Sequence, residues 1–274
     1  MILGIDVGGT HTDAVLLENF QVRKKAKVPT DQLHLVSSLV GVMDEILRGE
    51  DLSTLERVVF STTLSTNAIV QGKTDRVGMI VASGPGLAPE ALRVNDDTRF
   101  VSGYVSNRGI EAAPLKKGEI AGAAAELKAA GISHLGVAGK FSTRNPSHEN
   151  AIADLVRGDF RHISLGHRMS GNLNFRRRIA TTYLNASVFD LYSRFVEEIL
   201  AFAARTGITA PIYILKADGG TFEIRRSAEQ PVQTILSGPA ASVMGILSLA
   251  ECSGADAVAV DMGGTTTDIA LLAD

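Results

Sequence analysis

One motif occurs twice in the chain, near its two ends. The first copy, ILGIDVGGTHTDAVLLEN, spans residues 2–19, and the second, AVAVDMGGTTTDIALLAD, spans residues 257–274. A turn alone has no need to repeat the same polar side chains at the same offsets, so the repeat indicates a shared chemical role. The matching polar and glycine residues are Asp6, Gly8, Gly9, Thr10, Thr12 and Asp13 in the first copy, and Asp261, Gly263, Gly264, Thr265, Thr267 and Asp268 in the second.

Each copy has the pattern of a β-hairpin. Apolar β-branched residues run into the acidic residue, two glycines permit a turn with positive φ, and threonines followed by apolar residues lead away as a second strand. Glycines let backbone N–H groups approach an anion closely, threonine hydroxyls add donors, and a carboxylate at a strand end can hold Mg²⁺ through water. Each hairpin therefore predicts a phosphate loop, although a single copy would also fit an ordinary turn.

Two better-known nucleotide motifs do not fit the sequence. A dinucleotide fingerprint needs a helix after its glycines, whereas the residues after Gly9 favour a strand. The Gly72-Lys73-Thr74 segment resembles the end of a Walker A loop, but the first glycine of that motif would fall at Asn67. We therefore expect Gly72 to cap a helix.

Polar residues follow two other expected strands. The hydroxyl-rich segment 61–67 follows a strand expected at 57–60, at the end where open α/β sheets bind ligands, and helix capping explains it equally well. Asp218 follows a strand expected at 211–215 and precedes two glycines. We consider Asp218 a candidate base or second metal anchor, with a turn residue as the alternative.

Three consecutive arginines, residues 176–178, stand at the start of one long helix expected over residues 175–204. Arginines in such a cluster can bind a carboxylate or a phosphate. A solvated helix start is the commoner explanation, and we favour it here.

The composition excludes several classes of protein. A chain of 274 residues with 45% hydrophobic residues can bury a sizeable core, as one large or two modest domains. A net charge of −3 gives no footprint for nucleic acid or an anionic membrane. The single cysteine, Cys252, excludes an intrachain disulfide and a cysteine-based zinc site, and the histidines show no metal-binding spacing. Without a signal peptide or a long apolar run, we expect a cytoplasmic protein with neither membrane nor nucleic-acid partners.

The two hairpins resemble the phosphate 1 and phosphate 2 loops of the actin-like ATPase superfamily. Six segments between residues 4 and 272 resemble, in the same order, the A-type subunit of the hydantoinase/oxoprolinase family. The resemblance implies an α/β fold of the actin-like ATPase (ribonuclease H-like) type, in which helices flank a mixed sheet. The six segments are GIDVGGTHTDAVLL, STTLSTNAIV, RRRIATTYLNA, ADGGTF, TILSGPAAS and VDMGGTTTDIALL.

The resemblance also implies a domain division. Residues 1–180 would form the N-terminal domain with the phosphate 1 hairpin, and residues 181–274 a connecting helix and the start of the hydantoinase A core with the phosphate 2 hairpin. The sequence ends before the adenosine-binding segment that follows the second loop in such proteins. We therefore expect an incomplete second domain, a truncated or unusually short relative, and little activity in the isolated chain.

The implied function is the ATP-phosphate-binding part of an ATP-dependent hydantoinase/oxoprolinase-type amidohydrolase, or of a related carboxylase. ATP would phosphorylate a cyclic amide or an enolate oxygen, with Mg²⁺ as cofactor and a B-type hydantoinase subunit as partner. A small-molecule kinase of the same superfamily and a non-catalytic nucleotide-binding module remain alternatives. In this interpretation Asp6 and Asp261 anchor the metal, Asp218 is catalytic, and the phosphates contact Gly8, Gly9, Thr10, Thr12, Gly263, Gly264, Thr265 and Thr267.

Overall fold

The computed structural model describes residues 1–31, 35–249, 256–263 and 267–272. The chain forms two compact units, of which unit 1 contains residues 1–72 and 191–274 and unit 2 contains residues 73–190. Unit 1 is therefore built from both ends of the chain. The domain boundary between residues 180 and 181 is inferred from the family resemblance and not from the contacts that define these two units. It stays a prediction.

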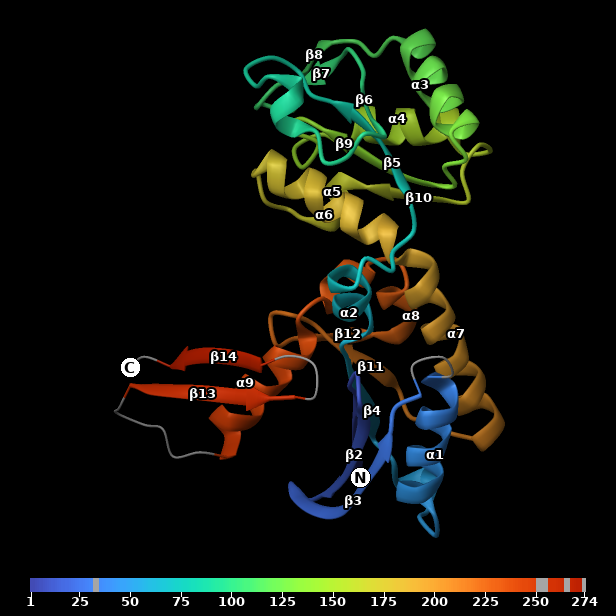
Figure 1. Ribbon diagram of the computed structural model, residues 1–274, viewed down its shortest axis with the longest axis vertical. Coiled ribbons are helices and arrows are strands. Elements are labelled where there is room, and N and C mark those ends of the chain that lie inside the picture. Colours follow the sequence, from blue (N-terminus) through green and yellow to red (C-terminus); the bar gives the residue numbers. More distant parts are fainter. Residues whose placement is uncertain (32–34, 250–255, 264–266, 273–274) are drawn as a thin grey trace. The chain divides into compact units, whose positions relative to one another are not determined.

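Unit 1 contains a six-stranded mixed sheet with the order β12-β11-β4-β1-β2-β3 (Figure 1). Strand β1 pairs antiparallel with β2 and parallel with β4, and β11 pairs parallel with β4. The carboxyl ends of β1, β4 and β11 therefore lie at one edge of the sheet. The strands are β1 (Ile2–Val7), β2 (His11–Glu18), β3 (Gln21–Pro29), β4 (Arg57–Thr62), β11 (Ile212–Leu215) and β12 (Thr221–Glu223).

The remaining elements of unit 1 are helices and the second hairpin. Strands β13 and β14 form a separate two-stranded antiparallel sheet in which Asp261 pairs with Asp268, as Asp6 pairs with Asp13 in the first hairpin. Both hairpins predicted from the repeat are thus confirmed. The elements are α1 (Leu35–Leu47), α2 (Leu64–Val70), α7 (Phe189–Thr206), α8 (Ile224–Ser227), α9 (Ser237–Leu249), β13 (Ala257–Met262), β14 (Thr267–Leu272) and two short 3₁₀ helices, Leu52–Thr54 and Pro231–Thr234.

The core of unit 1 follows from the periodicity of its elements. Alternate residues of β2 are buried, as expected for a strand with one face on the core. Apolar side chains of β1, α1 and α7, among them Leu3, Ile46 and Phe195, belong to one buried cluster. Gly72 follows α2 with a φ of +66°, which confirms its expected capping role.

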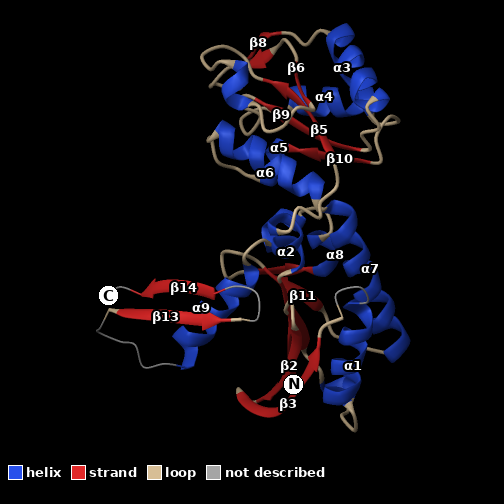
Figure 2. Cartoon of the chain, viewed as in Figure 1, coloured by secondary structure: helices blue, strands red, loops and turns tan. Residues whose placement is uncertain are grey.

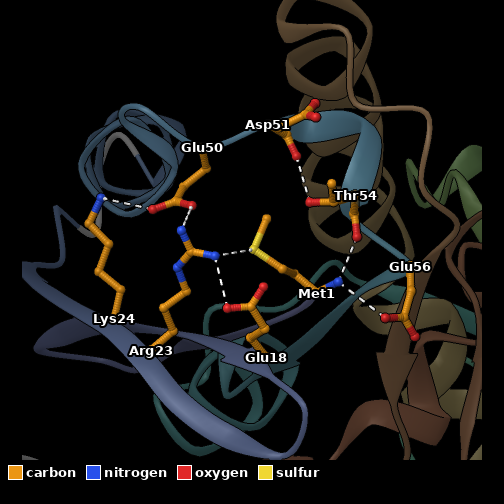
Figure 3. A network of polar contacts seen from close by, with 8 residues as sticks. All are labelled: Met1, Glu18, Arg23, Lys24, Glu50, Asp51, Thr54 and Glu56. Atoms are coloured by element: carbon orange, nitrogen blue, oxygen red, sulfur yellow. Dashed lines mark hydrogen bonds and ion pairs between the residues drawn. The ribbon is translucent and has the colours of Figure 1, made fainter.

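A network of polar contacts fixes the start of β1 (Figure 3). The amino group of Met1 donates to the carbonyl of Thr54 at 2.5 Å and pairs with Glu56 at 3.1 Å. Arg23 on β3 pairs with Glu18 at the end of β2 and with Glu50, which follows α1, both at 3.0 Å. Arg23 therefore links β3 to these two segments. These contacts hold β1 in register at the end opposite the Gly8-Gly9 turn.

Unit 2 is built on a four-stranded parallel sheet with the order β10-β9-β5-β6. All residues of β5 and β9 are buried, as is usual for parallel strands covered on both faces. Figure 2 shows helices on both sides of this sheet. The elements are β5 (Val77–Ala82), β6 (Thr98–Phe100), β7 (Tyr104–Val105), β8 (Glu111–Ala113), α3 (Lys117–Ala129), β9 (His134–Gly139), α4 (Ser147–Val156), β10 (His162–Leu165), α5 (Gly166–Met169), α6 (Phe175–Ser187) and the 3₁₀ helix Pro89–Leu92.

The single long helix expected over residues 175–204 is wrong. The segment forms two helices, α6 and α7, separated at Val188, where φ is −112° and ψ is 5°. The carbonyl of Ser187 accepts a hydrogen bond from the Asp75 N–H at 2.9 Å, so a contact from a distant segment replaces the regular helical bond at this point. Tertiary contacts thus override the continuous helical periodicity.

The expected solvated arginine cluster is only partly correct. Arg176 and Arg177 are exposed, whereas Arg178 is only 1% exposed. The Arg178 guanidinium donates to the carbonyls of Asn172 and Gly139 at 2.9 and 3.0 Å. Arg178 therefore joins the start of α6 to the end of β9, and it has a structural role in unit 2.

No helix in the described part of the chain is long and apolar enough to cross a membrane.

Glu149 is a buried carboxylate that joins α4 to the end of β9 and to α5. It is fully buried and accepts hydrogen bonds from the Gly139 N–H at 2.7 Å, the His167 N–H at 2.7 Å and His167 Nδ1 at 2.6 Å. Glu149→Gln places an amide N–H group against some of these donors. We expect a loss of about 1–3 kcal/mol in the free energy of unfolding, measured by urea denaturation.

The matched control is Glu126→Gln, because the Glu126 side chain on α3 is largely exposed and pairs with Arg99 at 2.7 Å. This change should cost less than about 1 kcal/mol. Equal stability losses in the two variants would show that the Glu149 contacts are not a determinant of the fold.

Candidate functional site

The two hairpins line one cavity of about 530 Å³ in unit 1. Residues of both copies of the repeated motif therefore lie at one cavity. Residues from β1, β2, β3, α2, α9, β13 and β14 contribute to its wall. The lining residues among those described are Asp6, Gly8, Gly9, Thr10, His11, Asp13, Lys27, Thr63, Asn67, Gly238, Pro239, Ser242, Asp261, Met262, Gly263 and Asp268.

Four carboxylates face this cavity, two from each hairpin: those of Asp6, Asp13, Asp261 and Asp268. Strand pairing explains the arrangement, because Asp6 is opposite Asp13 and Asp261 is opposite Asp268. Lys27 is the one lysine among the described lining residues, and its Nζ lies 3.0 Å from Asp13 Oδ1. The described wall is therefore acidic, as expected of a site for a hard divalent cation with oxygen ligands.

The cavity environment raises the pKa of Asp6 above its ordinary value of 3.8. The main cause is that the surrounding protein removes water from the ionised carboxyl, and the charges of Asp13 and Asp261 act in the same direction. The Ser61 hydroxyl and the Lys27 ammonium oppose the shift. Asp6 is thus held as a carboxylate at some cost, which a bound cation would remove.

Gly8 is required for a reason other than the positive φ expected from the sequence. Its φ is not in the left-handed region, but a Cβ at this position would lie 2.8 Å from the carbonyl oxygen of His11. The Gly8 N–H donates to the same oxygen at 3.0 Å and closes the turn. The Gly8 N–H is therefore occupied by this contact and is not available to an anion.

The predicted threonine ligands have different environments. Thr10 is exposed and lines the cavity. Thr12 does not line it, because alternation along β2 turns its side chain into the protein, where it is 0% exposed and its Oγ1 lies 2.9 Å from Thr30 Oγ1. The structure therefore argues against Thr12 as a phosphate ligand in this arrangement. Thr267 is exposed but outside the lining set, while Gly264 and Thr265 lie outside the described residues.

Asp218 is a turn residue and does not line the cavity. Its carboxylate accepts from Lys216 Nζ at 2.8 Å and from the Gly220 N–H at 2.9 Å. The hydrogen bond from Lys216 is the main cause of the lowered pKa of Asp218, and a lowered pKa makes a carboxylate a weaker base. The catalytic role considered for Asp218 is thus not supported by its position, and the alternative of a turn residue fits the contacts.

The start of α9 is a contributor that the sequence analysis did not include among the site residues. Gly238 and Pro239, in its first turn, line the cavity together with Ser242. Ser237 Oγ donates to the Thr62 carbonyl at 3.0 Å, which fixes the helix start beside the end of β4. The Ser-Gly-Pro sequence is the signal for this helix start, and an N-terminal helix end favours anions.

The segment after β4 also reaches the cavity, as expected for hydroxyl-rich residues at a strand end. Thr63 Oγ1 donates to the Val7 carbonyl at 3.3 Å, and Asn67 Nδ2 donates to Thr63 Oγ1 at 3.1 Å. Thr63 and Asn67 both line the cavity. This segment therefore joins the end of β1 to α2 and adds polar groups to the site.

Ionising Asp6 in the folded protein costs free energy, so the stability of the protein should depend on pH in a way that can be tested. Asp6→Asn should raise the free energy of unfolding at pH 7, because the cavity disfavours the ionised form of the Asp6 carboxyl in the folded wild-type protein. The advantage should shrink as the pH falls through the raised pKa, and vanish below 3.8, where the carboxyl is protonated in both states. Urea denaturation between pH 7 and pH 4 in metal-free buffer measures this difference.

Asp218→Asn is the matched control, because the pKa of Asp218 is lowered rather than raised. It should lower stability slightly at pH 7, since an exposed ion pair contributes little. An Asp6→Asn variant that is less stable than wild type at pH 7 would contradict the assigned electrostatic environment.

Comparisons with known proteins agree with this fold. A family model described as hydantoinase/oxoprolinase N-terminal region matches residues 2–160, and one described as hydantoinase/oxoprolinase matches residues 178–274. The caprolactamase subunit alpha of Pseudomonas jessenii is 28% identical to this chain, over 98% of this chain and 43% of its own length.

Two solved structures are similar to this chain over nearly its whole length. One is a nucleotide-free acetone carboxylase, with a TM-score of 0.84, 24% identity, and coverage of 98% of this chain and 43% of that chain. The other is an ATP-dependent caprolactamase from Pseudomonas jessenii, with a TM-score of 0.77, 25% identity, and coverage of 99% and 43%. The expected α/β fold of the actin-like ATPase type is confirmed. The chain spans less than half the length of these relatives.

Proposed function

The chain belongs to the hydantoinase/oxoprolinase family, and on this premise we propose that it forms the ATP-phosphate-binding part of an enzyme that phosphorylates a cyclic amide or an enolate oxygen. The observation that supports this proposal most directly is the single cavity lined by the acidic and glycine residues of both hairpins. We infer that the nucleotide is ATP, because two similar solved structures are described as ATP-dependent.

The acidic residues of the cavity would hold Mg²⁺. Asp6 and Asp261 end the first strands of the two hairpins and would bind the ion through water, with Asp13 and Asp268 adding negative charge. The residues fit the ion, because four carboxylates lie in one cavity, and burial together with the charges of Asp13 and Asp261 raises the pKa of Asp6. When bound, Mg²⁺ neutralises charge on the phosphates during transfer.

Phosphate oxygens would meet donors from three directions. The turn after Gly8 presents the Thr10 hydroxyl, while the first turn of α9 presents the positive end of a helix dipole. Lys27 is 59% exposed and can leave Asp13 to meet a phosphate oxygen. These groups would fix and stabilise the transferring phosphoryl group rather than attack it.

The nucleophile would be the substrate's own oxygen. In a cyclic amide, phosphorylation of the carbonyl oxygen makes the ring carbon electrophilic, so that water opens the ring and phosphate leaves. In a ketone enolate, phosphorylation of the oxygen prepares the molecule for carboxylation. We infer that a B-type subunit acts as partner, because the relatives include one named as an alpha subunit.

Metal-dependent nucleotide binding tests the site. Asp261→Asn should weaken binding of MgATP by at least about tenfold, because one carboxylate of the metal site is lost. The control Asp218→Asn should bind MgATP like wild type, because Asp218 lies outside the cavity lining. Isothermal titration calorimetry with and without Mg²⁺ measures both. Equal binding by wild type and Asp261→Asn would remove the second hairpin from the site.

Turnover by the complete protein with a B-type subunit tests the reaction. We expect phosphate release that depends on a lactam, a hydantoin, 5-oxoproline or a ketone, and a loss of about 10²-fold or more in Asp6→Asn. A phosphorylated product that accumulates without phosphate release would instead identify a small-molecule kinase. Nucleotide binding without turnover on any of these compounds would support a non-catalytic module.

A further inference from the structure

Unit 2 contains a second cluster of possible metal ligands, separate from the hairpin cavity. One ligand atom from each of Asp75, His134 and Asp190 lies within 4.8 Å of the others. Asp75 precedes β5, His134 begins β9, and Asp190 lies in the first turn of α7. Strands β5 and β9 are parallel neighbours, so their amino ends meet at one edge of the sheet. Three segments that are distant in sequence therefore meet at this edge.

The imidazole of His134 has a buried nitrogen without a hydrogen-bond partner. His134 is only 3% exposed, and its Nε2 lies 3.2 Å from Asp190 Oδ1 without the geometry of a hydrogen bond. Buried polar atoms are normally paired, because an unpaired one loses its hydration without compensation. Two ligands of a tetrahedral zinc ion are separated by about 3.3 Å, given bonds of about 2.0–2.1 Å. The observed separation therefore suits two ligands of one ion.

The other ring nitrogen of His134 is held in the way that metal-binding histidines usually are. Its Nδ1 lies 2.9 Å from the hydroxyl oxygen of Ser133. This oxygen can accept the Nδ1 proton, which leaves the lone pair of Nε2 for a metal ion. The contact thus orients the ring and is compatible with the tautomer that a metal requires.

The charges around the cluster are compatible with a bound cation. Arg161 pairs with Asp190 Oδ2 at 3.1 Å, so the guanidinium contacts the oxygen that faces away from His134 Nε2. The neighbouring His162 ring lies 6.4 Å from the His134 ring. Two carboxylates and one arginine give the cluster a net negative charge.

We propose that Asp75, His134 and Asp190 bind a divalent transition-metal ion such as Zn²⁺, with water completing the coordination. One imidazole and two carboxylates suit zinc and its first-row neighbours better than Mg²⁺. The chain enters unit 2 after Gly72 and leaves it at Leu191. Asp75 and Asp190 are thus next to these two points, and the ion would join the two chain segments that begin and end unit 2. We assign it a structural role.

The test uses the 274-residue chain after removal of metal with a chelator. Millimolar Mg²⁺ is kept in the buffer to occupy the hard carboxylate site of the hairpin cavity. We expect one equivalent of Co²⁺ to bind with a visible absorption band typical of four or five ligands that include nitrogen. Zn²⁺ should raise the Tm by about 5 °C or more at a hundredfold excess over Kd.

Two variants remove ligands from the cluster. Asp75→Asn changes an exposed side chain, and His134→Gln removes the nitrogen ligand. Each should weaken Co²⁺ binding at least tenfold and reduce the Zn²⁺-induced rise in Tm. The control is His148→Gln, because His148 is another buried histidine of unit 2 and pairs with Glu111 at 2.8 Å, outside the cluster. It should bind both ions like wild type.

The absence of saturable Co²⁺ and Zn²⁺ binding by the wild-type chain would overturn the proposal. Unchanged affinity and absorption in Asp75→Asn would overturn it as well, and this variant decides the matter if His134→Gln does not fold. MgATP binding at the hairpin cavity is a separate measurement, so failure at one site leaves the other site's result intact.

Discussion

The position of β1 within its sheet determines the geometry of the hairpin site. Strand β1 is hydrogen-bonded on both sides, and its register sets Asp6 opposite Asp13 on β2 and opposite Ser61 on β4. A slip by one residue would turn every side chain of β1 to the other face of the sheet. The contacts of Met1 and Arg23 at the far end of the strand oppose such a slip. The site therefore depends on pairing and polar contacts that lie outside it.

The cavity gathers like charges at a cost in stability. The pKa of Asp6 is raised mainly by the loss of water around its carboxyl and also by repulsion from the charges of Asp13 and Asp261. A fold selected for stability alone would not place four acidic side chains in one cavity. The arrangement is reasonable if the site is completed by a cation and a polyphosphate, which is the basis of the proposed function. The proposed site at His134 differs in chemistry, because it offers nitrogen as well as oxygen.

Local pattern was sufficient to predict both hairpins and several residues that line the cavity. The Asp-X-Gly-Gly-Thr repeat predicted both hairpins, and the alternation of apolar residues predicted the strands on either side of each turn. Asp6, Gly8, Thr10 and Asp261 line the cavity because they stand at strand ends or in turns, where sequence position and spatial position coincide. Thr12 does not line the cavity, because strand alternation turns its side chain into the protein.

The sequence by itself determined the hairpins, the strand and helix types and the family resemblance, since these follow from local periodicity and short motifs. Only the tertiary structure decided which distant segments meet. The break between α6 and α7 follows from a bond between Ser187 and Asp75, and the burial of Arg178 follows from carbonyls at Asn172 and Gly139. The meeting of Asp75, His134 and Asp190 has no local signal either. Contacts across such separations depend on the packing of whole elements, which no short stretch of sequence encodes.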